Sequence, residues 1–75
     1  MPRLPRISGA QAIETLSKFG FVLVRQRGSH SILKKKTLSG EIGCVVPLHP
    51  ELAVGTLRSI LRQAQIDPEQ FVGAL

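Results

Sequence analysis

Three short segments rich in β-branched and aliphatic residues follow one another closely in the middle of the chain. Their sequences are FVLVRQ at 21–26, HSILKKK at 30–36 and EIGCVVP at 41–47. The links between them, Arg27 to Ser29 and Thr37 to Gly40, are short and contain glycine, as in the turns that join antiparallel strands into hairpins. The spacing therefore predicts a three-stranded antiparallel sheet.

Helical patterns lie on both sides of these strands. Ser8, with Gln11 three residues later, matches a capping box, which predicts a helix over residues 9–19 that ends at Gly20. A second helix is predicted over residues 54–65 because apolar residues recur there at helical spacing. The residues of that apolar stripe are Val54, Leu57, Ile60, Leu61 and Ala64.

The C-terminal segment and the element order complete the expected architecture. Asp67 followed by Pro68 predicts a short final helical turn that buries Phe71. We expect one α+β domain over residues 1–75 in the order α-β-β-β-α, with the helices packed on one face of the antiparallel sheet. Residues 1–6 are expected to form a loose N-terminal segment. The apolar residues of the strands do not alternate cleanly, so they do not predict which face the helices cover.

The charge distribution favours a polyanionic partner. The chain has 10 Lys and Arg against 5 Asp and Glu, for a net charge of +5 at pH 7. Between Glu14 and Glu41 there are six cations and no acid. These cations are Lys18, Arg25, Arg27, Lys34, Lys35 and Lys36. A basic segment of this kind is typical of nucleic-acid binding, and a solvated face that only keeps the protein in solution is the open alternative.

Several classes of protein are disfavoured by the composition. The single Cys44 cannot form an internal disulfide or a thiolate metal site, and within a strand it is expected to be a buried apolar residue. The five carboxylates are scattered, whereas a two-metal phosphodiesterase needs a cluster of them, so nuclease chemistry would be metal-independent. No apolar run is long enough for a signal peptide or a membrane span, and we expect a cytoplasmic protein.

A candidate site arises where the expected hairpins bring the two histidines to one end of the sheet. If the second hairpin turn is symmetric, His30 lies opposite Pro47, and His49 lies near the same end. The second helix begins a few residues later, so its N-terminus, which favours anions, is expected there too. Arg25 and Arg27 flank this end. The sequence thus predicts a phosphate pocket with a group that can move protons near neutral pH.

Simpler interpretations of these residues stay open. His30 could be a solvent-facing strand residue that caps the turn, His49 could satisfy backbone carbonyls, and Ser29 could bond the turn backbone. The lysine run at 34–36 lies about 13–20 Å along the strand from His30, at about 3.3 Å per residue. It could hold a phosphate several nucleotides away, or it could equally protect an edge strand against unwanted pairing.

Four segments together resemble a known family. LPRISG, GFVLVRQRGSH, VVPLHPEL and GTLRSILRQA are similar to the HicA (YcfA-like) toxins of bacterial toxin–antitoxin pairs, over residues 3–71. The resemblance implies a double-stranded-RNA-binding-domain-like fold, an mRNA interferase activity with His30 as the catalytic histidine, and a HicB-type antitoxin that covers this region. Two departures are visible: HPELAVGTLR lacks a lysine often found there, and Gln65 stands where glycine is common. Gln65 is therefore expected to adopt a left-handed conformation, at a cost of about 1 kcal/mol.

The expected activity is metal-independent endoribonuclease cleavage of RNA, which requires the ribose 2′-OH as the internal nucleophile. His30 would act as general acid or base, with His49 as a possible second acid or base. The candidate RNA-binding residues are Arg25, Arg27, Gly28, Ser29, Lys34, Lys35, Lys36 and Thr56. No metal, small-molecule cofactor or membrane is expected as a partner, and sequence preference should be weak because Phe21 is the single aromatic residue of the strand segments, which leaves little for base stacking. A non-catalytic RNA-binding module and a subunit that only docks an acidic protein are the alternatives.

Overall fold

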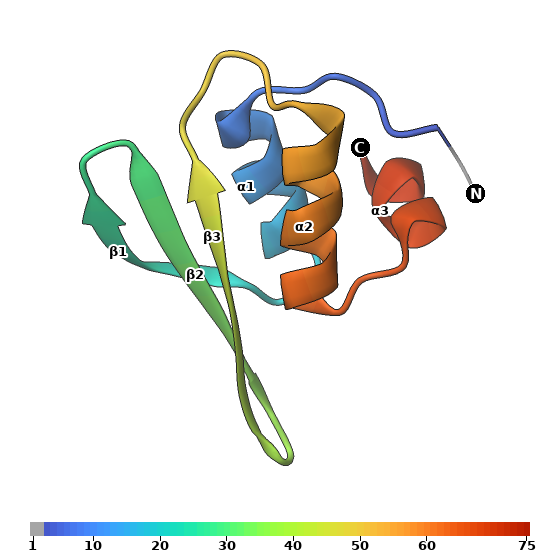
Figure 1. Cartoon of the computed structure of the whole chain (residues 1–75). Coiled ribbons are helices and arrows are strands. Elements are labelled where there is room, and N and C mark those ends of the chain that lie inside the picture. The colour runs from blue at the N-terminus through green and yellow to red at the C-terminus, as the bar shows by residue number, and fades with distance from the viewer. Residues whose placement is uncertain (1–2) are drawn as a thin grey trace.

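The structure is a computed structural model and describes residues 3–75. Within these residues the chain forms the predicted elements in the predicted order, and a third helix follows at the C-terminal end (Figure 1). The elements are α1 (Gly9–Ser17), β1 (Val22–Arg27), β2 (His30–Thr37), β3 (Gly40–Pro47), α2 (Val54–Ala64) and α3 (Pro68–Ala74). The α+β class and the α-β-β-β-α order are confirmed, and the arrangement is consistent with a double-stranded-RNA-binding-domain-like fold.

The sheet is antiparallel, with the strand order β1-β2-β3. The β2–β3 hairpin is symmetric, as expected: His30 lies opposite Pro47, and Thr37 lies opposite Gly40. The β1–β2 hairpin is irregular, because its register shifts between Leu23 and Arg25. A β-bulge of this kind places two residues of one strand opposite a single residue of its neighbour.

The helices cover one face of the sheet, and the burial of β2 shows which face it is. Ser31 and Leu33 are fully buried, whereas His30 and Lys34 are exposed. Side chains alternate between the two faces of a strand, so His30 and the other even-numbered residues of β2 point away from the helices. We call this uncovered side the open face. The core beneath the helices consists of Leu4, Ile7, Ala12, Leu16, Phe21, Leu33, Cys44, Val46, Leu52, Leu57, Ile60, Leu61, Ala64 and Phe71.

The ends of the helices agree closely with the sequence signals. Ser8 and Gln11 form the complete capping box of α1, which ends at Ser17, two residues earlier than expected. Gln65 ends α2 in the left-handed region with φ 57°, as expected. Asp67 caps α3, its carboxylate accepting a hydrogen bond from the backbone N–H of Glu69 at 2.9 Å.

The N-terminal segment differs from the expectation of a loose chain over its described part. Leu4 and Ile7 are only 4% and 8% exposed, because their apolar side chains join the core. The carbonyl of Ile7 accepts a hydrogen bond from the N–H of Leu52 at 2.7 Å, and Arg6 forms an ion pair with Glu51 at 3.0 Å. The segment therefore fastens the loop between β3 and α2.

The β2–β3 hairpin extends beyond β1 as a two-stranded arm (Figure 1). The pairing of β1 with β2 stops at Lys34, and from Lys35 to Thr37 β2 pairs with β3 alone. Leu38 at the tip of the arm is fully exposed. None of the helices within residues 3–75 has the length and apolar character needed to cross a membrane.

Candidate functional site

His30 is the first residue of β2, and its side chain is exposed on the open face. Its two neighbours across the sheet are Arg27 on β1 and Pro47 on β3. Directly paired residues of an antiparallel sheet project to the same side, so the imidazole and the Arg27 guanidinium share the open face. Solvent and a ligand can therefore reach the ring beside a fixed positive charge.

The bulge in β1 determines that both arginines lie on this face. Leu23 pairs with the buried Leu33, so its side chain lies on the helix-covered side. Strict alternation from Leu23 would turn Arg25 and Arg27 to the same covered side. The register shift at Val24 reverses the alternation, so that Arg25 pairs with Ile32 and Arg27 pairs with His30. The consecutive apolar residues of β1 conceal this bulge in the sequence.

The turn before His30 is held by two polar side chains on the covered side. Gly28 has φ 58°, a left-handed conformation that suits glycine in a two-residue hairpin connection. The amide nitrogen of Gln26 donates to the carbonyl of Gly28 at 2.8 Å. The hydroxyl of Ser31, which is fully buried, donates to the amide oxygen of Gln26 at 2.8 Å. Gln26 and Ser31 thus fix the turn, and sequence reasoning missed both because neither residue type is diagnostic there.

The segment that carries His49 lies against the same turn. The backbone N–H of Leu48 donates to the carbonyl of Ser29 at 2.6 Å, and the carbonyl of His49 accepts a hydrogen bond from the N–H of Gly9 at 2.9 Å. The His49 side chain is exposed. The sheet register therefore brings Ser29, His30 and the segment 47–49 together at one end of the sheet.

The sequence predicted that the N-terminus of α2 lies near His49. The N-terminus that is hydrogen-bonded to the segment of His49 is that of α1, through the N–H of Gly9. The capping box of α1 already satisfies its N-terminus, which leaves little for an anion. α2 begins at the same end of the molecule (Figure 1), and its N-cap, Ala53, provides no side-chain hydrogen bond. Thr56, in the first turn of α2, is half-buried. The first amides of α2 thus remain available at this end, although no described hydrogen bond joins them to the β1–β2 turn.

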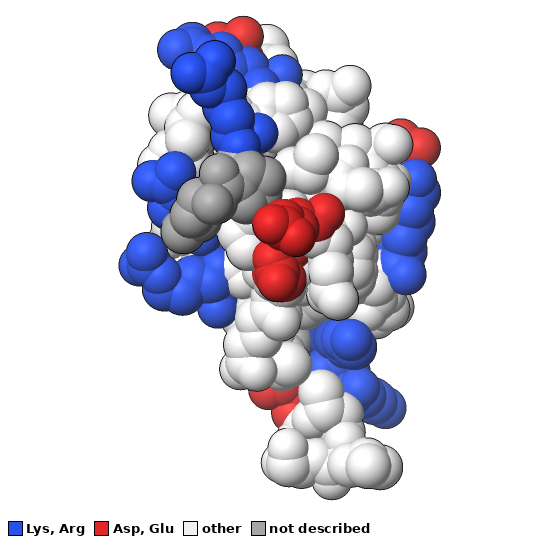
Figure 2. Space-filling view, turned by 90° about the vertical axis from the view of Figure 1, so that its right-hand side faces the viewer, with Lys and Arg blue, Asp and Glu red and all other residues white. Residues whose placement is uncertain are grey.

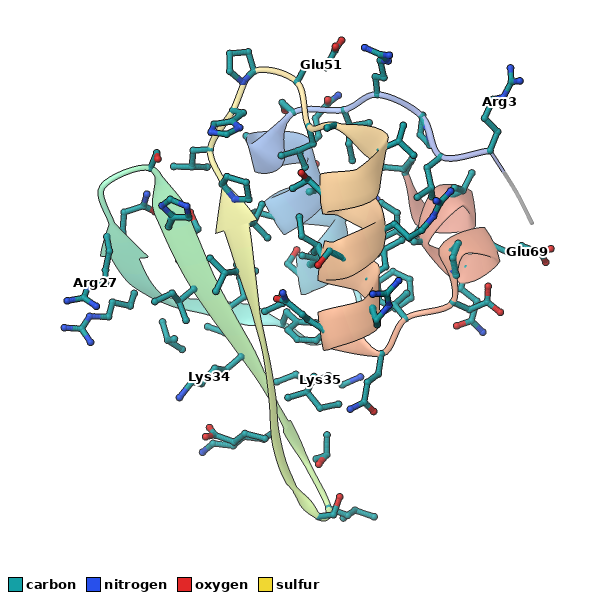
Figure 3. All side chains as sticks on the ribbon, viewed as in Figure 1. Arg3, Arg27, Lys34, Lys35, Glu51 and Glu69 are labelled. Carbon is teal, nitrogen blue, oxygen red and sulfur yellow. The ribbon has the colours of Figure 1, made fainter. Side chains whose placement is uncertain are left out.

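The three lysines of β2 divide between the two faces. Lys34 and Lys36 are exposed on the open face, in line with His30. Lys35 points to the other side, with its Nζ 6.0 Å from the centre of the Phe21 ring. Figure 3 shows the same division, since Lys34 and Arg27 extend away from the helices and Lys35 lies toward α2. The structure thus brings two of the three lysines onto the face of the candidate site.

A shallow hollow of about 410 Å³ lies on the open face beside these lysines. It is lined by Gly20, Val22, Val24, Lys34, Lys36 and Glu41. Glu41 forms an exposed ion pair with Lys34 at 3.9 Å. Exposed pairs of this kind contribute little to stability, so Lys34 can exchange this carboxylate for another anion at small cost.

Charge is distributed unevenly between the sheet and the rest of the chain. Five of the cations and only one acid, Glu41, lie on the three strands. Figure 2, which looks onto the side that carries α3, shows acidic atoms in the middle of that face and basic atoms mainly toward its margins. The sheet therefore presents the more strongly positive surface of the molecule.

The remaining candidate groups lie apart from this surface. Cys44 is 2% exposed on the covered side, and burial raises the pKa of its thiol to about 11. The prediction that Cys44 is a buried apolar residue is confirmed. Across residues 3–75, His, Cys, Asp and Glu nowhere form a group of three that could hold a metal ion.

Comparison with known proteins identifies one family. A family model described as the HicA toxin of bacterial toxin–antitoxin systems matches residues 9–66. The matched range runs from the first residue of α1 to just beyond α2, and so includes the whole sheet and both histidines. No curated protein matches the chain.

Proposed function

Because the chain belongs to the HicA toxin family of bacterial toxin–antitoxin systems, we propose that it is a metal-independent endoribonuclease that cleaves mRNA through His30. The family supports a toxin role and implies an antitoxin partner. The observation that carries the proposed activity is the exposed imidazole of His30 beside Arg27 on the uncovered, basic face of the sheet. The imidazole can take or give a proton, and the Arg27 guanidinium beside it can bind a phosphate.

The proposed reaction uses the RNA's own 2′-hydroxyl as the nucleophile. His30 as general base removes the 2′-OH proton while the 2′-oxygen forms a bond to phosphorus. The bond from phosphorus to the 5′-oxygen breaks, and this oxygen takes a proton from a general acid. The products are a 2′,3′-cyclic phosphate and a 5′-hydroxyl end. His49 supports the second proton transfer in this scheme, since its segment is hydrogen-bonded to the turn that precedes His30.

Negative charge that develops on the phosphate oxygens needs fixed donors. Arg27 pairs with His30, and Arg25 lies two residues further along β1 on the same face. Guanidinium groups suit phosphate because they offer two parallel N–H donors. In the proposal these two side chains hold the scissile phosphate, and the Gly28–Ser29 turn with the first turn of α2 at Thr56 lines the same end.

The flanking RNA follows the open face along β2. Lys34 lies about 13 Å and Lys36 about 20 Å from His30 at about 3.3 Å per residue. These distances match phosphates a few nucleotides from the cleavage site. Lys35 was also a candidate contact, but its position beside Phe21 makes it a support for the fold in this proposal. An mRNA substrate would place the activity in the cytoplasm, where a HicB-type antitoxin would bind the toxin and inhibit it.

One observation favours a second candidate, a non-catalytic RNA-binding module. The His30 imidazole has no hydrogen-bond partner among the described residues, whereas many catalytic histidines are oriented by one. In that case His30 would only contact a phosphate.

Cleavage of a long single-stranded RNA by a His30→Ala variant separates the two candidates. The proposal expects the rate to fall by about 10²–10⁴-fold with RNA binding retained, and activity of the unchanged protein to survive EDTA. His49→Ala tests the second proton transfer, and its cleavage rate should also fall by up to about 10²–10⁴-fold. Unchanged cleavage by His30→Ala, or loss of activity in EDTA, would contradict the proposal.

A further inference from the structure

The two edges of the sheet differ in how far they are protected. On β3, the N–H of Val45 donates to the side-chain oxygen of Gln63 from α2 at 3.1 Å, and Pro47 has no N–H to offer. α2 therefore covers this edge at Val45. At the outer edge of β1, no helix or loop within residues 3–75 forms a hydrogen bond with the strand backbone.

β1 is also unusual in its exposed apolar residues. Val22, Leu23 and Val24 are 62%, 48% and 53% exposed. Leu23 lies on the helix-covered side and Val22 on the open face, so both sides of this edge are apolar. Three consecutive apolar residues on a free edge are a template for another strand, and soluble proteins usually blunt such an edge with charged residues or bulges. In β1 the charges, Arg25 and Arg27, and the bulge come at or after Val24, so Val22 and Leu23 carry no such protection.

We propose that the free edge of β1 receives an extended segment of the antitoxin, which pairs with Val22–Val24 and places acidic side chains beside Arg25 and Arg27. The docking itself depends only on the toxin–antitoxin family, and its inhibitory effect depends on the proposed ribonuclease activity. The bulge at Val24 limits regular pairing to a few residues. The hollow lined by Gly20, Val22 and Val24 offers space for an apolar side chain of the added segment.

The chemistry of this edge favours an acidic protein segment over the other possible occupants. RNA gains little from aliphatic side chains, because bases stack on aromatic rings, and β1 carries none. A second copy of this chain would bring its own Arg25 and Arg27 against these, with a net charge of +5 on each protein. Carboxylates at the same positions would instead be attracted.

The position of this edge explains how docking would inhibit. Arg27 and His30 form a cross-strand pair, so acidic side chains that bind Arg27 from the outer edge of β1 place negative charge close to the imidazole. The same acidic side chains would compete with the phosphate for Arg25 and Arg27. Inhibition then requires no change in the fold of the toxin.

The test uses the toxin and its cognate antitoxin in the absence of RNA. Amide hydrogen exchange is measured for β1 in the free toxin and in the complex. Strand addition should slow exchange of β1 amides at least about tenfold, as new backbone hydrogen bonds form along the edge. A complex in which the amides of β1 exchange as fast as in the free toxin would overturn the proposal, whether or not the toxin cleaves RNA.

A pair of variants gives the second readout. Val22→Glu with Val24→Glu adds negative charge to the free edge, and calorimetry should show at least about tenfold weaker antitoxin binding. Val45→Glu is the control, because Val45 is 39% exposed on the open face but belongs to the protected strand β3. It should change affinity by less than about threefold. Equal weakening by both would show that the antitoxin covers the sheet face in general, and would count against the edge.

Discussion

Gly9 and Pro47 meet where the first turn of α1 lies against the end of β3. A Cβ atom on Gly9 would overlap the carbonyl oxygen of Pro47 and would lie 3.0 Å from the Cα of Leu48. These neighbours are backbone atoms, which cannot swing away as a flexible side chain would. The absence of a side chain at Gly9 thus allows α1 to hold the segment that lies opposite His30.

Gly9→Ala should therefore destabilise the protein by about 1–3 kcal/mol, as overpacking does, although alanine is the better helix former. Urea unfolding measures the change. Gly73→Ala is the matched control, because a Cβ atom at Gly73 of α3 meets nothing within 4 Å. That variant should be neutral or more stable by up to about 1 kcal/mol. Equal effects of the two substitutions would show that the close contact at Gly9 is unimportant.

The hydrogen bond between Ser31 and Gln26 gives a second prediction. Gln26→Ala removes the acceptor of a fully buried hydroxyl and should cost about 1–3 kcal/mol. Gln26→Ala together with Ser31→Ala should cost less than the sum of the single variants, because no unpaired hydroxyl remains. A double-mutant cycle measures this coupling, and strict additivity would contradict the proposed role of the pair in fixing the turn.

The lysines of β2 allow a charge-matched comparison. Lys34→Ala and Lys36→Ala should each lower the slope of log affinity against log salt concentration by about 0.7 for single-stranded RNA. Lys35→Ala removes the same charge from the covered side, beside Phe21, and should leave the slope almost unchanged. Filter binding of a homopolymeric RNA at several salt concentrations measures all three. Similar slopes for the three variants would contradict an RNA path along the open face.

Local signals predicted most of the fold, and the exceptions are informative. The capping box, the symmetric β2–β3 hairpin and the proline at the start of α3 are short-range patterns, so the sequence reveals them directly. The covered face was not predictable, because consecutive apolar residues in β1 conceal the bulge at Val24. The proximity of His30 to the segment of His49 followed from the hairpin register alone. The bracing by Gln26 and Ser31 did not, since it depends on tertiary burial.

Gln65 is a correctly predicted strained position and gives a stability prediction. Its φ of 57° costs a residue with a side chain about 1–2 kcal/mol. Gln65→Gly removes that strain but makes the unfolded chain more flexible, so the net gain should be about 0.5–1 kcal/mol. The midpoint of urea unfolding measures it. Gln65→Ala is the control, because alanine keeps the Cβ atom and should give no such gain.

The raised pKa of the buried Cys44 thiol predicts that the folded protein loses stability at alkaline pH. Burial raises the pKa of the folded thiol from 9.0 to about 11, so the folded protein holds this proton where the unfolded chain releases it. The contribution is fully present below pH 9 and is lost as the pH rises toward about 11, for a total of about 2–3 kcal/mol. The comparison is with Cys44→Ala, which lacks the thiol and is less stable at neutral pH. The stability difference between the two proteins should shrink as the pH rises, and a difference that stays constant would show that the thiol does not titrate in this way.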